Sequence, residues 1–319
     1  MNPQRSDAAI GVDVGGTKIA AGVVAADGTV IEMVRLPTPP HDPQALEQRI
    51  GDAVIELSGR HPVAAVGLAV AGFVDEKRSL VRFAPNLSVS HRPLRESVGA
   101  RVGLRVVVEN DANAAAWGEV RFGAGQGSAD VLMITVGTGL GGGIVLDGRL
   151  VRGAFGGAGE FGHVRMVPGG LLCGCGKRGC WEQYASGSAL VRRTRELVAA
   201  DPAAGRVLLA LADGDAAQIR GTMITEAARQ GDPVACEALA EVGRWLGEGI
   251  ADLADVLDPE VVVIGGGVSQ AGDLLLDPAR QAYAEHLTGA GHRPRLRIVS
   301  AALGNDAGLI GAADLARVP

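Results

Sequence analysis

The stretch from residue 8 to residue 18 reads AAIGVDVGGTK, an apolar run that stops at a pair of glycines. Its small and β-branched residues over Ala8–Val14 predict a buried strand. After the glycines, Ile19–Ala25 predicts a second strand, and Asp27-Gly28 is a turn signal leading into a third over Val30–Leu36. The chain therefore opens with three consecutive strands joined by tight turns.

The same order of features returns about 120 residues further along the chain. Residues 131–136 predict a strand, 137–143 a glycine-rich break, and 144–146 a strand that reaches a second turn signal at Asp147-Gly148 before 149–152. The order of predicted strands and turns is repeated although the residues themselves differ, and this repeat predicts two similar halves. Two such halves facing each other across a cleft are typical of a duplicated α/β kinase architecture.

Further elements follow from the period of the apolar residues. Buried strands are expected at 63–70, 104–108 and 261–264, and helices at 44–57, 112–121, 239–257 and 307–315. The fold class is therefore α/β.

The composition of the chain argues against nucleic acid and membranes as partners. The chain has 319 residues, a formal net charge of −6 and only 3% aromatic residues. It has no basic stripe and few rings on which bases could stack, so nucleic acid is not an expected partner. No apolar run reaches the length of a membrane span, and no secretory leader precedes the first strand. We therefore expect a cytoplasmic protein with no membrane partner.

The first glycine-rich turn has the composition of a phosphate-binding loop. Paired glycines at Gly15 and Gly16 let backbone N–H groups approach phosphate oxygens, and Thr17 and Lys18 add a donor and a positive charge. Asp13, which can only accept, would suit Mg²⁺ or the waters that it coordinates. The alternative is a tight hairpin with a solvated lysine.

Two later glycine-rich segments suggest further approach points for a nucleotide. A strand rather than a helix follows Gly137-Thr138-Gly139, so a phosphate hairpin fits this segment better than a dinucleotide-binding loop. No P-loop sequence occurs in the chain. Gly266 and Gly267 follow a buried strand and could admit an adenine–ribose face, although by themselves they are only a strand-to-helix turn.

Asp111 stands where a predicted strand ends and a helix begins. Phosphoryl transfer needs an acceptor for the proton of the attacking hydroxyl, and a carboxylate at the end of a strand can serve as that base. The alternative role is the N-cap of the helix, for which Asn110 is equally suited.

The segment from residue 160 to residue 182 combines a potential metal site with two carboxylates. His163, Cys173, Cys175 and Cys180 offer three thiolates and an imidazole, a complete tetrahedral set for a structural Zn²⁺. The metal would fold a glycine-rich loop and hold Glu160 and Glu182 near one another. Both glutamates, with Asn110 and His163, could present hydrogen-bonding groups to a polyhydroxylated ring. The alternative is three unrelated cysteines in a reducing compartment.

These residues resemble the ROK family, which groups sugar kinases with sugar-responsive repressors, over nearly the whole chain. The likeness rests on Asp13–Lys18, Glu109–Asn113, Gly137–Gly143, Glu160–His163 and Cys173–Glu182. Within the family it is greatest to actinobacterial glucokinases, and residues 107–127 are part of that likeness.

The resemblance implies an α/β fold of the actin-like, hexokinase type (ribonuclease H-like) with two lobes. We expect residues 1–110, completed by a C-terminal helix at 304–319, to form the small lobe. Residues 111–303, with the zinc loop at 163–182, would form the large lobe.

The resemblance also implies ATP-dependent phosphorylation of glucose at its 6-hydroxyl, with Mg²⁺ and a structural Zn²⁺, by a homodimer or homotetramer. Asp111 corresponds to the catalytic base. The positions that correspond to glucose contacts are Gly72, Asn86, Asn110, Glu160, His163 and Glu182. Thr17 and Thr138 fall at phosphate positions, Gly266 and Gly267 fall near adenosine, and His163 with Cys173, Cys175 and Cys180 matches the zinc set.

Other functions remain open at this level. Family members phosphorylate other hexoses or N-acetylated sugars, or use polyphosphate as the donor, and the motifs do not choose between them. A sugar-binding repressor without catalysis is disfavoured, because the first strand starts by residue 8 and leaves no room for a helix-turn-helix domain ahead of it.

Overall fold

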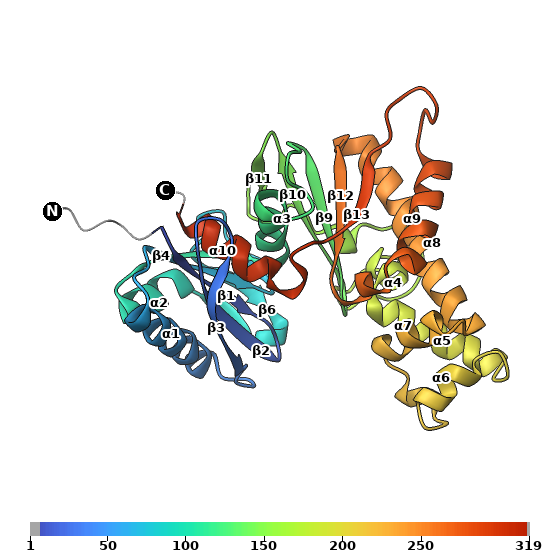
Figure 1. The fold of residues 1–319 in the computed structure, drawn as a ribbon, viewed down its shortest axis with the longest axis horizontal. Coiled ribbons are helices and arrows are strands. Elements are labelled where there is room, and N and C mark those ends of the chain that lie inside the picture. Colours follow the sequence, from blue (N-terminus) through green and yellow to red (C-terminus); the bar gives the residue numbers. More distant parts are fainter. Residues whose placement is uncertain (1–6, 318–319) are drawn as a thin grey trace. The chain divides into compact units, whose positions relative to one another are not determined.

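The computed structural model describes residues 7–317, which form two compact units (Figure 1). As far as it is described, the first unit comprises residues 7–133, 143–159 and 302–317, and the second comprises 134–142 and 160–301. These units differ from the expected lobes in that residues 111–133 and 143–159 belong to the first. No helix within residues 7–317 has the length and apolar character needed to cross a membrane.

The first unit is built on a five-stranded sheet in the order β3-β2-β1-β4-β8. Its strands are β1 (Ala9–Val14), β2 (Lys18–Val24), β3 (Val30–Pro37), β4 (Ala65–Val70) and β8 (Arg105–Asn110). The first three pair antiparallel, as the predicted hairpins require, and β1, β4 and β8 pair parallel. The strands expected in this half of the chain are confirmed.

Both faces of this sheet are covered by helices (Figure 1). One face of β1, which includes Ile10 and Val12, packs with α1 (Pro43–Arg60) and α2 (Leu94–Val102) in one core. The other face, which includes Ala9, packs with α10 (Ala307–Arg317). Two glycines in the strands allow α10 to come close: a Cβ at Gly11 would lie 1.9 Å from Leu309 O, and one at Gly67 would lie 1.8 Å from Ala312 O.

A helix and a small second sheet also belong to the first unit. The helix α3 (Asp111–Phe122) packs against α10 through Ala114 and Ala312. A small sheet of β5 (Phe73–Val74), β6 (Val81–Ala84) and β7 (Val89–Arg92), with a 3₁₀ turn at Pro85–Leu87, has no counterpart in the sequence predictions. Its strands are too short for an apolar period to stand out.

The second five-stranded sheet has the order β11-β10-β9-β12-β13. Its strands are β9 (Val131–Val136), β10 (Leu140–Leu146), β11 (Arg149–Val151), β12 (Val261–Gly265) and β13 (Arg297–Ser300). The predicted turn at Asp147-Gly148 joins β10 to β11, with both residues at positive φ (50° and 67°). The glycine-rich break is shorter than expected, because β10 already begins at Leu140. Gly143 lies within this strand, where a Cβ would lie 2.6 Å from that of Ala116 in α3.

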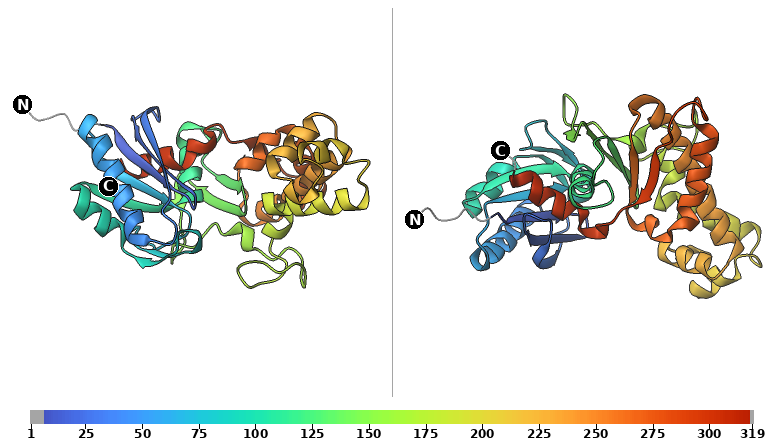
Figure 2. Two further views of the ribbon diagram at one scale, coloured as in Figure 1. Left: turned by 90° about the horizontal axis from the view of Figure 1, so that it is seen from below. Right: turned by 45° about the horizontal axis from the view of Figure 1, so that its top comes forward.

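The second unit is otherwise mainly helical (Figure 2). Its helices are α4 (Glu182–Ala185), α5 (Gly187–Ala200), α6 (Arg206–Leu211), α7 (Gly221–Arg229), α8 (Pro233–Leu257) and α9 (Asp273–His286). The predicted helix at 239–257 is confirmed as part of α8. It begins earlier, because Asp232 caps the helix by accepting from the Ala235 N–H at 3.0 Å and Pro233 starts the first turn.

Candidate functional site

The first group of candidate residues follows the carboxyl ends of three parallel strands. Val14 of β1 pairs with Val70 of β4, which pairs with Asn110 of β8, so these strands end at one edge of the sheet. Ligands of open α/β sheets bind at such an edge. The Gly15-Gly16 turn, Gly72 and Asp111 follow the three strand ends, and the structure therefore brings them together within the first unit.

The Gly15-Gly16 turn lies against the turn that carries Asn86. The Gly15 N–H donates to Lys18 O at 3.0 Å, which closes the hairpin, and the Thr38 hydroxyl donates to Gly15 O at 2.6 Å. A Cβ at Gly16 would lie 3.2 Å from that of Asn86. Gly16, Thr17 and Lys18 are exposed. This turn can therefore present backbone N–H groups, a hydroxyl and an ammonium to an anion.

Asp13 is the last residue but one of β1, and it is largely buried. Burial raises the pKa of its carboxyl to about 6, with nearby Lys18 lowering it and Asp306 raising it. The first turn of α10 lies close by, since a Cβ at Gly308 would lie 3.8 Å from the carboxyl carbon of Asp13 and from Asp111 O. A divalent cation nearby would stabilise the ionised form of this carboxylate, because it offsets the free-energy cost of burying the negative charge.

Asn110, and not Asp111, is the N-cap of α3. Asn110 has extended backbone angles, and its side-chain oxygen accepts from the Asn113 N–H at 3.0 Å. Its side-chain amide donates to Gly72 O and to Asp111 Oδ1, both at 3.1 Å. Asp111 is the first residue of the helix. The capping role that the sequence offered as an alternative for Asp111 therefore falls to its neighbour, which also orients the aspartate.

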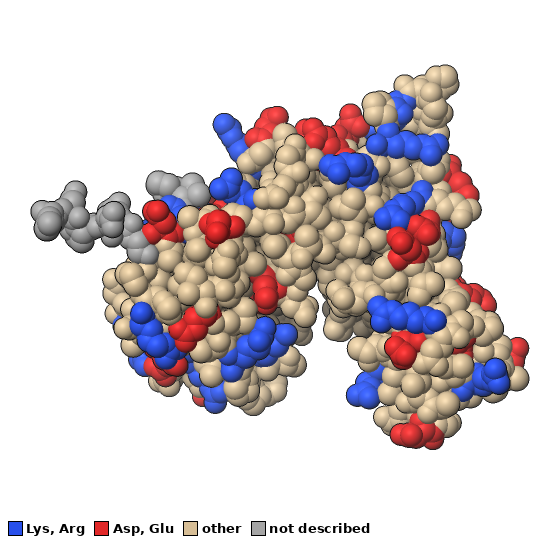
Figure 3. Space-filling view, viewed as in Figure 1, with Lys and Arg blue, Asp and Glu red and all other residues tan. Residues whose placement is uncertain are grey.

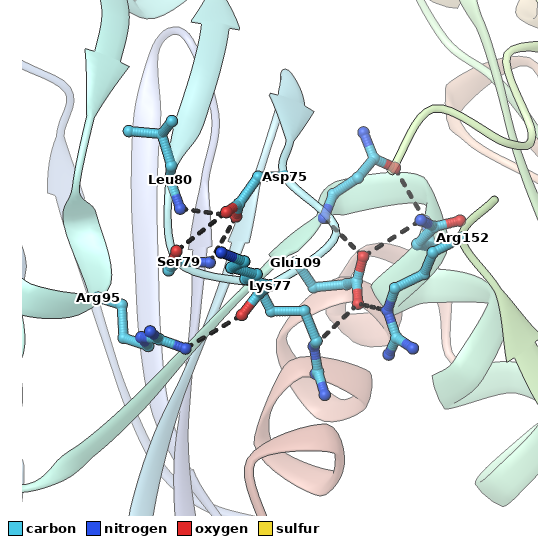
Figure 4. A network of polar contacts seen from close by, with 10 residues as sticks. Asp75, Lys77, Ser79, Leu80, Arg95, Glu109 and Arg152 are labelled. Atoms are coloured by element: carbon cyan, nitrogen blue, oxygen red, sulfur yellow. Dashed lines mark hydrogen bonds and ion pairs between the residues drawn. The ribbon is translucent and has the colours of Figure 1, made fainter. Parts of the chain in front are cut away.

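Sequence reasoning missed one buried carboxylate in this group. Glu109, the last residue but one of β8, is only 2% exposed and contacts Arg78, Arg152, Asn110 and Asn113 (Figure 4). The available signal was a glutamate at the end of an otherwise apolar strand, since a fully buried glutamate requires partners.

The second group of candidates, in the second unit, contains a Cys/His cluster. One ligand atom from each of His163, Cys173, Cys175 and Cys180 lies within 4.8 Å of the others. The Cys173 Sγ is 3.7 Å from His163 Nδ1, and the Cys175 Sγ is 3.6 Å from that of Cys180. Two Zn–S bonds of about 2.3 Å at a tetrahedral angle span about 3.8 Å. Two pairs already have this spacing, and the four side chains could therefore hold a metal ion after small shifts.

The loop that carries these cysteines is irregular and tightly wrapped. Gly176 and Gly179 have φ of 86° and 79°, and a Cβ at Gly179 would lie 1.6 Å from Val167 O. Burial raises the pKa of Cys173, and raises that of Cys180 to about 12, whereas the Lys177 N–H lowers that of Cys175. Without a cation the two buried sulfurs would be protonated, so a bound metal would displace their protons.

The carboxylates of Glu160 and Glu182 lie beside this cluster. Glu182 Oε2 accepts from the Leu140 N–H at 3.0 Å, and its Oε1 is 3.7 Å from the Cys173 Sγ. Burial raises the pKa of Glu160, with His163 lowering it and Glu182 raising it. Because His163 turns Nδ1 toward the thiols, its Nε2 is left for another partner. The structure therefore brings together the three residues of this segment that were expected to contact a sugar.

The remaining glycines of the second group meet at the ends of β9 and β12. The Gly137 N–H donates to Gly139 O at 3.0 Å, and Gly137 O and Thr138 O accept from Gly187 N–H and the Ser188 hydroxyl at 2.7 and 2.8 Å. Gly266 has φ of 85°, and a Cβ there would lie 2.6 Å from Val136 O. Only glycine allows this approach, after which Gly267 begins a 3₁₀ turn.

Two five-stranded sheets flanked by helices and glycine-rich turns make a mixed α/β kinase fold of the hexokinase type. A family model matches residues 9–318. The chain belongs to the ROK family.

The relatives cover almost the whole chain. A glucokinase of Streptomyces coelicolor is 55% identical over 310 residues, which are 97% of this chain and 98% of that protein. The crystal structure of a ROK family glucokinase from Streptomyces griseus in complex with glucose and AMPPNP has a TM-score of 0.90 at 55% identity, covering 98% of this chain and 100% of that one. A ROK hexokinase from Thermus thermophilus has a TM-score of 0.79 at 34% identity, covering 98% of both chains.

Proposed function

We propose that this protein is a glucokinase that transfers the γ-phosphoryl group of ATP to the 6-hydroxyl of glucose. The observation that carries the proposal is the position and orientation of the Asp111 side chain. Asp111 is the first residue of α3, Asn110 provides the cap of that helix, and the Asn110 amide orients the Asp111 carboxylate at 3.1 Å. The Streptomyces relatives, matched over nearly their whole length, support the same reaction.

Asp111 would act as the general base. It accepts the proton of the sugar 6-hydroxyl as that oxygen bonds to the γ-phosphorus, while the bond from phosphorus to the bridging oxygen breaks and ADP leaves. We assign sugar binding to Gly72, Asn86, Asn110, Glu160, His163 and Glu182. Such groups suit a hexose because carboxylates and amides accept and donate hydrogen bonds to adjacent hydroxyls.

The glycine-rich turns would bind the nucleotide. We assign phosphate contacts to Gly15, Gly16, Thr17, Lys18, Gly137, Thr138 and Gly139, and adenosine contacts to Gly266 and Gly267. Exposed N–H groups in such turns bind anions. Mg²⁺ would accompany ATP, with Asp13 as the protein carboxylate that faces it directly or through water.

The Cys/His cluster would hold a structural Zn²⁺. The donor set and its near-tetrahedral spacing support this metal, and four protein ligands leave no position for a catalytic water. The ion would fix the loop that carries Glu182 and His163. None of the four cysteines forms a disulfide, which supports a cytoplasmic location, where cysteines stay reduced.

The central test is the isosteric change Asp111→Asn. We expect kcat for glucose phosphorylation to fall by about two to four orders of magnitude, because the proton acceptor is lost. Circular dichroism and the urea midpoint should stay close to the unchanged protein, since Asn110 provides the cap. A variant with undiminished turnover would remove Asp111 from the mechanism.

A panel of sugars and phosphoryl donors tests the choice of substrate. Glucose with ATP should give the highest kcat/KM, compared with mannose, N-acetylmannosamine and N-acetylglucosamine, and with polyphosphate as donor. A preference for another hexose or for polyphosphate would keep the kinase and change its substrate. Light scattering on the eluted protein should give the mass of a dimer or a tetramer.

A repressor-like function without catalysis is the weaker alternative. Positive and negative side chains are interspersed over the face shown in Figure 3, without a broad basic surface on that face. A DNA-binding surface needs clustered lysines and arginines. Turnover of glucose by the purified protein would decide against this alternative.

A further inference from the structure

Glu109 is a buried carboxylate surrounded by hydrogen-bond donors (Figure 4). Its Oε1 accepts from the Asn110 N–H and from the Asn113 side-chain amide, both at 3.2 Å. Its Oε2 accepts from Arg152 Nε at 2.6 Å and lies 3.3 Å from Arg78 Nε. One oxygen therefore faces the start of α3, and the other faces two guanidinium groups.

Arg78 is presented by a turn that the structure holds in a strained conformation. Its φ is 56°, a left-handed backbone that residues other than glycine rarely adopt. Asp75 stabilises the turn by accepting from the N–H groups of Ser79 and Leu80 at 2.7 and 2.8 Å, and Arg95 donates to Lys77 O at 3.0 Å (Figure 4). A turn fixed from several sides is needed to keep such a backbone in place.

The guanidinium of Arg78 depends on Glu109. Its Nε and Nη2 are buried and make no hydrogen bond among the described residues. Burial lowers the pKa of Arg78 to about 10, and Glu109 opposes this shift. A buried cation with so few partners is stable only beside a carboxylate.

Arg152 comes from a second segment that packs on the same turn. Beyond β11 the chain folds back, with the Ala158 N–H donating to Arg152 O at 3.0 Å. Gly156 has φ of 81°, and a Cβ there would lie 2.2 Å from Val74 O. Both arginines therefore reach Glu109 from segments that are themselves in close contact.

We propose that Glu109 is a positioning residue for Asp111, clamped by Arg78 and Arg152 so that it fixes the first turn of α3 and the orientation of the aspartate. Fixing the Asn110 backbone also fixes the Asn110 side chain, whose amide holds Asp111 Oδ1. The inference rests on the proposed function, because it assigns Glu109 a role through the base of that reaction.

The need for a carboxylate follows from its neighbours. Glu109 accepts hydrogen bonds from the Asn110 N–H, the Asn113 amide and Arg152, and it forms an ion pair with Arg78, so an ionised carboxylate suits all four neighbours. A glutamine at this position would turn its NH₂ group toward a donor at one end. Either the arginines or the first turn of α3 would then lose an acceptor and shift.

The test is a double-mutant cycle between Glu109→Gln and Asp111→Asn. Glu109→Gln alone should lower kcat by about 10- to 100-fold, as expected when the orientation of a reacting group relaxes, with a smaller change in KM for ATP. In the Asp111→Asn background, Glu109→Gln should cost less than about twofold, because there is no longer a base to orient. A purely structural role would give the same loss in both backgrounds.

The matched control is Glu47→Gln, which breaks another partly buried glutamate–arginine pair, with Arg92 Nη2 at 2.8 Å from Glu47 Oε1. It should keep kcat within about twofold, as expected for a pair that contacts no proposed site residue. If Glu109→Gln and Glu47→Gln give the same kcat, or if the losses multiply in the double variant, the positioning role is overturned.

A second variant keeps the test decisive if Glu109→Gln does not fold. Arg152→Lys retains the charge but loses the Nε donor, and this side chain is 24% exposed and tolerates the change better. Its kcat should fall by about tenfold, with no further loss in the Asp111→Asn background. A kcat equal to that of the unchanged protein would overturn the positioning role. Absence of turnover in the unchanged protein on every sugar would instead overturn the proposed function, and the inference with it.

Discussion

The two groups of site residues are held in place in different ways. In the first unit, Asn110 and Asp111 stand where β8 meets α3, and they are positioned by the helix cap, by Gly72 just beyond β4 and by a buried ion pair at Glu109. In the second unit, His163 and Glu182, the first residue of α4, flank a largely irregular segment that contains the Cys/His cluster. The comparison teaches that a largely irregular segment has few strand or helix ends to position its side chains, so a local crosslink such as a bound metal would add most to its order there.

Removing a ligand of the cluster should give the largest effect. We expect Cys175→Ser to lose about one metal ion per chain and several kcal/mol of the free energy of unfolding, because metal binding contributes directly to folding. Metal analysis and thermal unfolding would measure both, and the melting transition of the second unit should move most.

Cys236→Ser is the matched control for that change. Cys236 lies in α8, outside the cluster, and its thiol donates to Ala228 O at 3.6 Å. This variant should keep its metal. Equal metal content in both variants would contradict the cluster as a metal site.

A pH series on Asp13 should show an intermediate effect on stability in the first unit, whose described residues contain no Cys/His cluster of this kind. The pKa of Asp13 rises from 3.8 to about 6 on folding because of burial. The folded state therefore favours the neutral acid, and the stability that this contributes is complete below about pH 4 and lost as the pH rises through 6.

Asp13→Asn stays neutral at every pH and should expose this difference. The free energy of unfolding of this variant should exceed that of the unchanged protein by near zero at pH 4 and by about 3 kcal/mol above pH 7. Urea unfolding with a chelator and without nucleotide measures it, since a bound cation would offset the burial cost. Parallel pH profiles for the two proteins would be inconsistent with a raised pKa.

The smallest effect is expected at the cap of α3. Asn110→Ala should lower the free energy of unfolding by about 1 kcal/mol, because the Asn113 N–H loses its acceptor. Asn110→Asp retains the capping oxygen and should restore most of this loss in urea titrations. A neutral alanine variant would mean that the tertiary contacts of α3 alone define its start.

The sequence predicted the structure best where a group of residues has a single common structural role, such as a buried strand or a set of metal ligands. Short, almost continuous runs of apolar and β-branched residues predicted β1 and β9, and the spacing of His163 and the three cysteines predicted the cluster. It was ambiguous at Asn110 and Asp111, because either residue can cap a helix and only the backbone angles choose between them.

The remaining features depend on contacts between distant segments. Glu109 and Arg152 are 43 positions apart, and no local pattern pairs them. Likewise, the glycine at 143 reads as a break until the neighbouring helix, with Ala116, shows why a strand residue there must lack a side chain.

The closing helix of the first unit has a consequence for biosynthesis. One face of the sheet, including Ala9, Ala20 and Val24, is covered by residues of α10, which the ribosome makes after every other helix and strand within residues 7–317. A nascent chain can pair its early strands and dock α1, yet it carries an open apolar surface until α10 has been synthesised. The protein should therefore depend on protection by chaperones during synthesis, and truncations that remove α10 should aggregate rather than fold into a smaller unit.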